Sequence, residues 1–218
     1  MTLTEQQILQ NRDEFISLLN KIQRPGANIP KLIKKLDDNN FFSAPASLKY
    51  HGAYVGGLVE HCLNVYANLI KLVNSKSDFF TYYGKPFPNE ETLIIVALLH
   101  DLDKMNKYTQ GTRNVKKYSP NGSKHDEIGN FDWITELCFQ LDTSGKHIVY
   151  GNHEMNSEYM ARQFIPLTVE ESVAILHHMG GMSFDSSKEE LNVIFSEYWL
   201  ALFLHLADMI STYVDEQE

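Results

Sequence analysis

Histidines and aspartates interrupt the most apolar stretches of this sequence, and they are the residues best suited to chemistry. His61 lies three residues after Leu58, so on a helix both side chains share one inward face. His100 and Asp101 adjoin each other in the run LIIVALLHDLDK, and Asp208 lies within LALFLHLADMI. A buried carboxylate without a partner is costly. These acids therefore require a partner inside the protein.

A divalent metal ion suits both residue types, because imidazole nitrogen and carboxylate oxygen are among its natural ligands. An ion pair is the competing solution, and Lys104 lies three residues after Asp101, but it cannot also explain Asp208. A single inward histidine is more often a core residue bonded to a backbone carbonyl than a ligand, and His125 and His147 lie in polar loops. Four polar groups on three apolar helices together favour a metal centre.

Helices must position these residues, and the hydrophobic periodicity predicts a mostly helical chain. The expected helices span residues 4–22, 29–37, 57–75, 89–104, 153–165, 168–180 and 189–214. Asn89 followed by two glutamates is typical of a helix start, and Thr168 with Glu171 fits a capping box. Residues 41–54 and 76–89 are expected to be loops.

Residues 105–150 depart from this pattern. Their glycines and proline predict an irregular excursion, with a β-hairpin around 120–122 and a short helix at 132–140. The excursion carries a basic cluster: Arg113, Lys116, Lys117 and Lys124. A run of basic residues in a loop is most often a solvated surface.

Composition narrows the function classes. A length of 218 residues with 43% hydrophobic content suits one compact domain with a small appendage. The two cysteines, Cys62 and Cys138, lie far apart, so neither a disulfide framework nor a cysteine zinc site is expected. A net charge of −9 argues against long nucleic acid but not against a small phosphate ester. With neither a signal peptide nor a membrane-length apolar run, we expect a cytoplasmic protein that contacts no membrane.

The order of these residues resembles the H…HD…D signature of the HD-domain metal-dependent phosphohydrolases. His61, the pair His100–Asp101, and Asp208 stand in that order. Three local motifs strengthen the resemblance: HGAYVGGLVEHCLNVY at 51–66, ALLHDLDK at 97–104 and LHLADMISTYVDE at 204–216. It implies an all-α fold, an HD-domain helical bundle at 45–218, preceded by an N-terminal helical segment at 1–44.

The resemblance also implies the metal ligands. The first ion would be held by His61, His100, Asp101 and Asp208. The segments GNHEMNSEYMA (151–161) and AILHHMGG (174–181) resemble motifs of a dinuclear subset. There His153 and His178 would hold a second ion, with Asp101 bridging. The cofactor would be one or two divalent transition-metal ions, Fe, Mn or Zn, with Mg, Ni or Co also compatible.

Two histidines are expected to support the site rather than bind metal. Helical spacing alone does not choose between His177 and His178, but His178 matches the family's His-Met-Gly ending, which leaves His177 a supporting role. His205 lies three residues before Asp208 on the same helical face, where it either orients that carboxylate or packs.

The catalytic residues implied are Asp101 and Lys104, the latter facing a substrate phosphate. Further substrate contacts are expected from His51 and Tyr54 in the first motif and from Arg113.

Asp103 is a departure from the family, which often has a small residue there. The extra acid is expected to add negative charge and to disfavour a phosphate close to Lys104.

The resemblance implies hydrolysis of a phosphate ester, in a nucleotide or similar small metabolite, by a metal-activated water. Three alternatives stay open: an HD exoribonuclease, a di-iron oxygenase of the myo-inositol oxygenase type, and a non-catalytic nucleotide-sensing module. The exoribonuclease is expected to carry an oligonucleotide-binding domain, and the segment 1–44 is too short and too helical for one. The oligomeric state is left open.

Overall fold

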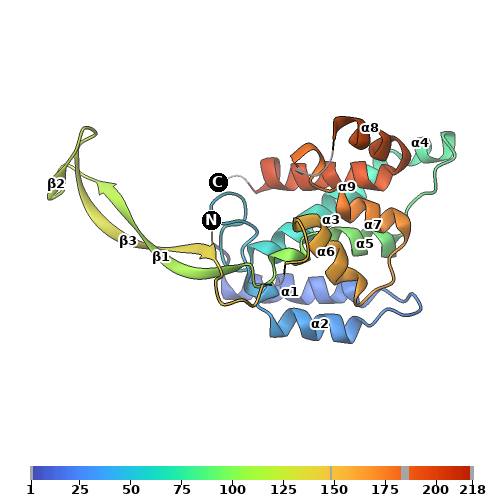
Figure 1. Cartoon of the computed structure of the whole chain (residues 1–218), viewed down its shortest axis with the longest axis horizontal. Coiled ribbons are helices and arrows are strands. Elements are labelled where there is room, and N and C mark those ends of the chain that lie inside the picture. Colours follow the sequence, from blue (N-terminus) through green and yellow to red (C-terminus); the bar gives the residue numbers. More distant parts are fainter. Residues whose placement is uncertain (1, 148, 183–186, 217–218) are drawn as a thin grey trace.

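The protein is a helical body from which a long β-hairpin projects (Figure 1). The computed structural model describes residues 2–147, 149–182 and 187–216. The helices are α1 (Glu5–Leu19), α2 (Ile29–Asp38), α3 (Gly57–Ser75), α4 (Ser77–Tyr82), α5 (Glu90–Leu99), α6 (His153–Arg162), α7 (Val169–Leu176), α8 (Lys188–Glu197) and α9 (Trp199–Ile210). Short turns of 3₁₀ helix lie at η1 (Phe41–Ser43), η2 (Leu102–Lys104) and η3 (Gly180–Met182), and a π-helical turn, η4 (Ser211–Asp215), follows α9.

Local sequence signals start several of these helices. The Asn89 side chain accepts a hydrogen bond from the Thr92 backbone N–H at 2.8 Å and so caps α5. Thr168 and Glu171 form a reciprocal capping box at the start of α7, as the sequence predicts. Both caps set where a site-bearing helix begins.

The core surrounds α5, in which every residue from 93 to 99 is buried. On one side α5 and α3 pack with α1, α2 and η1. On the other side they pack with α7 and α9. The N-terminal helices therefore share one core with the helices that carry the histidines.

The hairpin confirms the predicted β excursion but contradicts the predicted helix at 132–140. Strand β1 (Tyr108–Tyr118) pairs antiparallel with β3 (Asn130–Leu141), and the short β2 (Lys124–His125) pairs with the other side of β3. Within β3, aromatic residues alternate at 131 and 133, a pattern that favours a strand. Cross-strand pairing over the whole length of β1 decides the conformation.

Two further boundaries differ from expectation. The segment 76–89 contains a short helix, α4, rather than only loop. The helix expected at 189–214 is two helices, because Tyr198 leaves the helical region at φ −111° and ψ 82°. Of the described helices, none alone is long and apolar enough to cross a membrane; α8 together with 199–215 reaches that length, but the pair is bent by 109°.

Candidate metal centre

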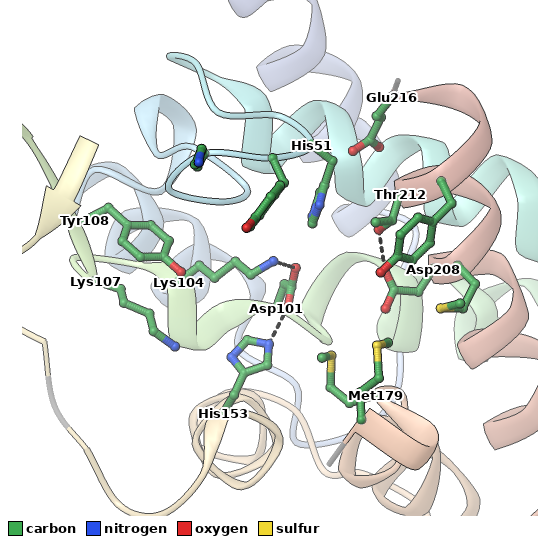
Figure 2. Close-up of a pocket in the computed structure, with 15 residues that line it drawn as sticks. His51, Asp101, Lys104, Lys107, Tyr108, His153, Met179, Asp208, Thr212 and Glu216 are labelled. Atoms are coloured by element: carbon green, nitrogen blue, oxygen red, sulfur yellow. Dashed lines mark hydrogen bonds and ion pairs between the residues drawn. The ribbon is translucent and has the colours of Figure 1, made fainter. Parts of the chain in front are cut away.

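Five elements bring the expected metal ligands to one place, and three of these ligands, Asp101, His153 and Asp208, line a pocket (Figure 2). The residues are His61 on α3, His100 and Asp101 just after α5, His153 at the start of α6, His178 just after α7, and Asp208 on α9. One ligand atom each from His61, His100 and Asp101 lie within 4.8 Å of one another, as do those of Asp101, His153 and His178. The two groups share Asp101.

His100 and His178 are oriented by their own helices. The Nδ1 of His100 donates to the Ala97 carbonyl at 2.8 Å, and the Nδ1 of His178 donates to the Ile175 carbonyl at 2.7 Å. A neutral imidazole with its proton on Nδ1 carries a lone pair on Nε2. Burial and the neighbouring imidazoles lower the pKa of His178 to about 3, which keeps that ring neutral.

His61 and His153 are oriented by carboxylates instead. The Nδ1 of His61 lies 3.1 Å from Glu216 Oε1, and the Nδ1 of His153 lies 2.9 Å from Asp103 Oδ2. In each of the four rings, Nδ1 therefore faces an acceptor outside the cluster. The same arrangement fixes the tautomer of histidines that bind metals.

The four Nε2 atoms face the carboxylates of the cluster. Nε2 of His100 is 3.5 Å from Asp101 Oδ2, and Nε2 of His178 is 3.8 Å from Asp101 Oδ1. The buried Nε2 of His100 has no hydrogen-bond partner among the described residues. A lone pair opposite a carboxylate is repulsive unless a cation lies between them. The donor set of imidazole nitrogens and carboxylate oxygens therefore fits a divalent transition metal.

A proton can take the place of a cation at His61. Its Nε2 lies 3.2 Å from Asp208 Oδ1. Burial alone lowers the pKa of His61, but the contacts with the carboxylates of Asp208 and Glu216 outweigh burial and raise the pKa to about 10. Metal binding at this position would displace that proton.

Asp101 is the centre of the cluster and also pairs with Lys104. The Nζ of Lys104 lies 2.6 Å from Asp101 Oδ2 (Figure 2). Burial alone raises the pKa of Asp101, but Lys104, His100 and His153 hold it well below its usual range. The Lys104–Asp101 ion pair, which the sequence offers as the alternative to a metal ion, is thus present. It provides no partner for the buried Nε2 of His100.

A pocket of about 730 Å³ opens above these residues. Its lining includes the lysines at 49, 104 and 107 and the methionines at 179, 182 and 209. Lys104, Lys107 and Tyr108 lie on one side of Asp101 in Figure 2, and Met179 lies on the other. These two cations therefore lie on one side of Asp101, and Met179, Asp208 and Glu216 lie on the other.

The expected substrate contacts divide into two groups. Lys104 and His51 line the pocket. Tyr54 does not, and its hydroxyl donates to Glu60. Arg113 does not line the pocket either, because it lies on the hairpin with its Nη2 3.6 Å from Glu136 Oε2. Pairing of β1 with β3 carries that side chain away from the pocket.

The supporting histidines are also located. His178, and not His177, faces the carboxylates, while His177 is the half-buried C-cap residue of α7. The Nδ1 of His205 donates to the His178 carbonyl at 2.7 Å. His205 thus holds the backbone of His178 rather than the carboxylate of Asp208.

Sequence reasoning missed the role of Glu216, Lys107 and His147. Glu216 lies beyond the helix expected to end at residue 214, and it meets His61 across 155 residues of the sequence. His147 lies in an irregular loop, and no local signal indicates its contact with Asp103 at 2.8 Å across 44 residues.

Comparison with known proteins finds distant relatives that share one name. The chain is 23% identical over 155 residues to the 3'-5' exoribonuclease YhaM of Listeria innocua, covering 68% of this chain and 46% of that protein. It is 24% identical over 128 residues to the 3'-5' exoribonuclease YhaM of Listeria monocytogenes, covering 59% of this chain and 37% of that protein.

The chain thus spans less than half the length of the curated relatives it matches. No protein-family model matches it, and no solved structure matches it. The similarity supports a distant relationship to hydrolases of phosphodiester bonds. The structure adds a mostly helical fold and a cluster of histidines and aspartates.

Proposed function

We propose that this chain is a metal-dependent phosphohydrolase of the HD-domain class, acting on a phosphate ester of a nucleotide. The observation that carries the proposal is the shared orientation of four imidazoles. Each directs Nδ1 to an acceptor outside the cluster and Nε2 toward the carboxylates. The similarity to exoribonucleases supports the hydrolysis of phosphate esters.

Two ions fit the donor set. His61, His100 and Asp208 would hold one ion and His153 and His178 the other, while Asp101 would contact both. Ions of this kind lower the pKa of a coordinated water and stabilise negative charge on a phosphoryl group. The proposed HD domain spans residues 45–218 and is preceded by the N-terminal helical segment 1–44, which packs in the same core.

The chain's own residues supply the remaining chemistry. Lys104 is mostly buried. Burial lowers its pKa, but the charge of Asp101 has the larger effect, so the pKa of Lys104 is raised overall. It is therefore a fixed cation at the pocket floor, suited to a phosphoryl oxygen. Burial, His61 and Lys104 lower the pKa of His51 to about 4, so His51 is neutral at pH 7 and can accept a hydrogen bond from a substrate.

A second candidate is a 3′–5′ exoribonuclease, the activity for which the distant relatives are named. The similarity to exoribonucleases weighs against the expectation from the sequence that this protein does not bind long nucleic acid. The negative net charge of −9 favours the small substrate. The two candidates share the metal cluster and differ in what fills the pocket.

The test is a hydrolysis assay on protein stripped by a chelator and then reloaded separately with Mn²⁺, Fe²⁺ or Zn²⁺. Substrates are nucleoside monophosphates, a cyclic nucleotide and short end-labelled oligoribonucleotides. We expect metal-dependent hydrolysis of a nucleotide, lost in Asp101→Ala and retained in the hairpin control Asp132→Ala.

Other outcomes of this assay would favour one of the alternative functions. Stepwise shortening of the oligoribonucleotide with the nucleotides untouched would favour the exoribonuclease. Oxygen consumption by the iron form without hydrolysis, or tight nucleotide binding without turnover, would contradict the proposal and favour the oxygenase or the sensing module.

A further inference from the structure

Asp103 is the most heavily bonded side chain beside the metal cluster. Its side chain is about 1% exposed and accepts from four donors. They are His153 Nδ1 at 2.9 Å, His147 Nε2 at 2.8 Å, Lys107 Nζ at 2.5 Å and Asn156 Nδ2 at 2.6 Å. A buried carboxylate with this many donors is held in one position.

The backbone of Asp103 is fixed as well. Its N–H donates to the Ser157 hydroxyl on α6 at 3.1 Å. Asn156, which donates to Asp103, also accepts from the backbone N–H groups of Tyr150 and Gly151 at 2.6 and 2.9 Å. Asp103 thus joins the turn η2 to α6 and to the loop that precedes α6.

We propose that Asp103 is a positioning residue that orients His153 for the second metal ion. The inference rests on the proposed function. The His153 ring spans two carboxylates, with Nδ1 at Asp103 and Nε2 2.6 Å from Asp101 Oδ1 (Figure 2). A carboxylate behind a ligating imidazole fixes the ring's tautomer and direction and raises its basicity.

The position of His153 in its helix explains why an external acceptor is needed. His100 and His178 each bond to a carbonyl three residues earlier in their own helix. His153 is the first residue of α6, after the cap Asn152, so no helical carbonyl precedes it at that distance. Asp103 supplies the acceptor that the helix start lacks.

The same contacts change the expected effect of Asp103 on substrate. Its charge is matched by Lys107, and the carboxylate lies behind His153 with almost no exposed surface. It therefore adds little repulsion toward a phosphate at Lys104. The expectation that this acid disfavours phosphate neglected the donors that the fold brings to it.

The test is a titration of metal-free protein with Mn²⁺ by calorimetry, for wild type, Asp103→Ala and Asp103→Asn. We expect wild type to bind two ions. Asp103→Ala retains the ion held by His61, His100 and Asp208 and binds the other about 10- to 100-fold more weakly. Asp103→Asn recovers part of that loss, because its amide oxygen still accepts from His153.

Glu171→Gln is the matched control. Glu171 is also fully buried and multiply bonded, but its partners are Arg24, Thr92 and Thr168, away from the cluster. It should bind both ions as wild type does, at a temperature where circular dichroism shows every variant folded.

Three outcomes overturn the inference, and they are distinguishable. If wild type and both Asp103 variants bind two ions equally well, the inference is wrong while the proposed function stands. If wild type itself binds no ion, the proposed function and the inference fail together. Equal loss of both ions in Asp103→Ala with no recovery in Asp103→Asn would assign Asp103 a purely structural role.

Discussion

At the scale of the residue, the candidate site depends on what lies behind each imidazole. Backbone carbonyls orient His100 and His178, and carboxylates orient His61 and His153. The first pair follows from helix geometry, since a residue at a helix end lies beside the carbonyl three positions earlier. The second pair depends on contacts across 155 and 50 residues. The sequence motifs indicated all four histidines, and the tautomers became visible only in the fold.

Lys104→Ala should separate catalysis from metal binding. Lys104 contacts Asp101 and is proposed to stabilise negative charge on the phosphoryl group, but it is not a proposed metal ligand. We therefore expect turnover to fall about 10²-fold. Removing a cation beside the cluster should leave the bound metal unchanged or tighter. Steady-state kinetics and elemental analysis measure the two effects. Lys117→Ala on the hairpin is the control, and wild-type turnover in Lys104→Ala would exclude Lys104 as a phosphate contact.

Glu216→Gln should weaken the ion held through His61. The carboxylate lies 3.1 Å from His61 Nδ1 and also accepts from Asn64 at 3.0 Å. Loss of its charge should lower the affinity for that ion by about 10-fold, the lower end for partners of this kind. A Mn²⁺ titration with an unchanged binding isotherm would show that Glu216 is not needed to orient His61.

At the scale of the element, the site is built from helix ends. The residues after α5 and α7 and the first residue of α6 meet in the cluster, while α3 and α9 contribute from within helices. The hairpin contributes its base, where Lys107 and Tyr108 line the pocket. The rest of β1 and β3 extends away from the body (Figure 1). The arm is thus separable from the cluster.

Shortening the hairpin tests that separation. In this variant an Asn-Gly turn replaces residues 113–136 and joins Thr112 to Leu137. We expect it to fold with unchanged metal content, because no residue of the cluster lies on the removed segment. Its melting temperature should shift by less than about 4 °C. Loss of metal, or collapse of the helical circular dichroism spectrum, would show that the arm supports the site.

Local signals predicted some elements well and others poorly. The helix 57–75, the cap at Asn89 and the capping box at Thr168 were predicted correctly, because periodicity and caps act within a few residues. Strand β3 was mistaken for a helix, since its pairing partner lies far along the chain. No glycine or proline lies at Tyr198, so the sequence contains no local signal for the break between α8 and α9.

At the scale of the whole molecule, one buried ion-pair network joins the N-terminal segment to the core. Arg24, between α1 and α2, bonds to Glu171 on α7 at 2.6 and 2.7 Å and to Glu91 on α5 at 3.1 Å. The Glu171 side chain is 0% exposed, and that of Arg24 is 13% exposed. Three segments that are far apart in sequence are thereby held in one arrangement.

Glu171→Gln should destabilise the fold and reduce its acid sensitivity. Burial raises the pKa of Glu171, but the bonds from Arg24, Thr168 and Thr92 outweigh it and lower the pKa below 4.5. Its stabilisation is therefore complete above pH 4.5 and is lost as the pH falls through the folded-state pKa. At pH 7 the variant should lose about 3 kcal/mol of unfolding free energy.

Urea denaturation at pH 7 and pH 4 measures this effect. The gap between wild type and Glu171→Gln should narrow at the lower pH, because wild type then begins to lose the contribution of the charged carboxylate. A gap that stays constant or widens on acidification would contradict the assignment of a lowered pKa to Glu171.

The central claim is that the cluster around Asp101 holds metal ions, and elemental analysis tests it most directly. Purified wild-type protein and Asp101→Ala would be measured as isolated and after reconstitution with excess divalent ions. We predict about two equivalents of iron, manganese or zinc in wild type and less than one in Asp101→Ala, with unchanged helical content. Wild-type protein that stays free of metal after reconstitution would contradict the claim.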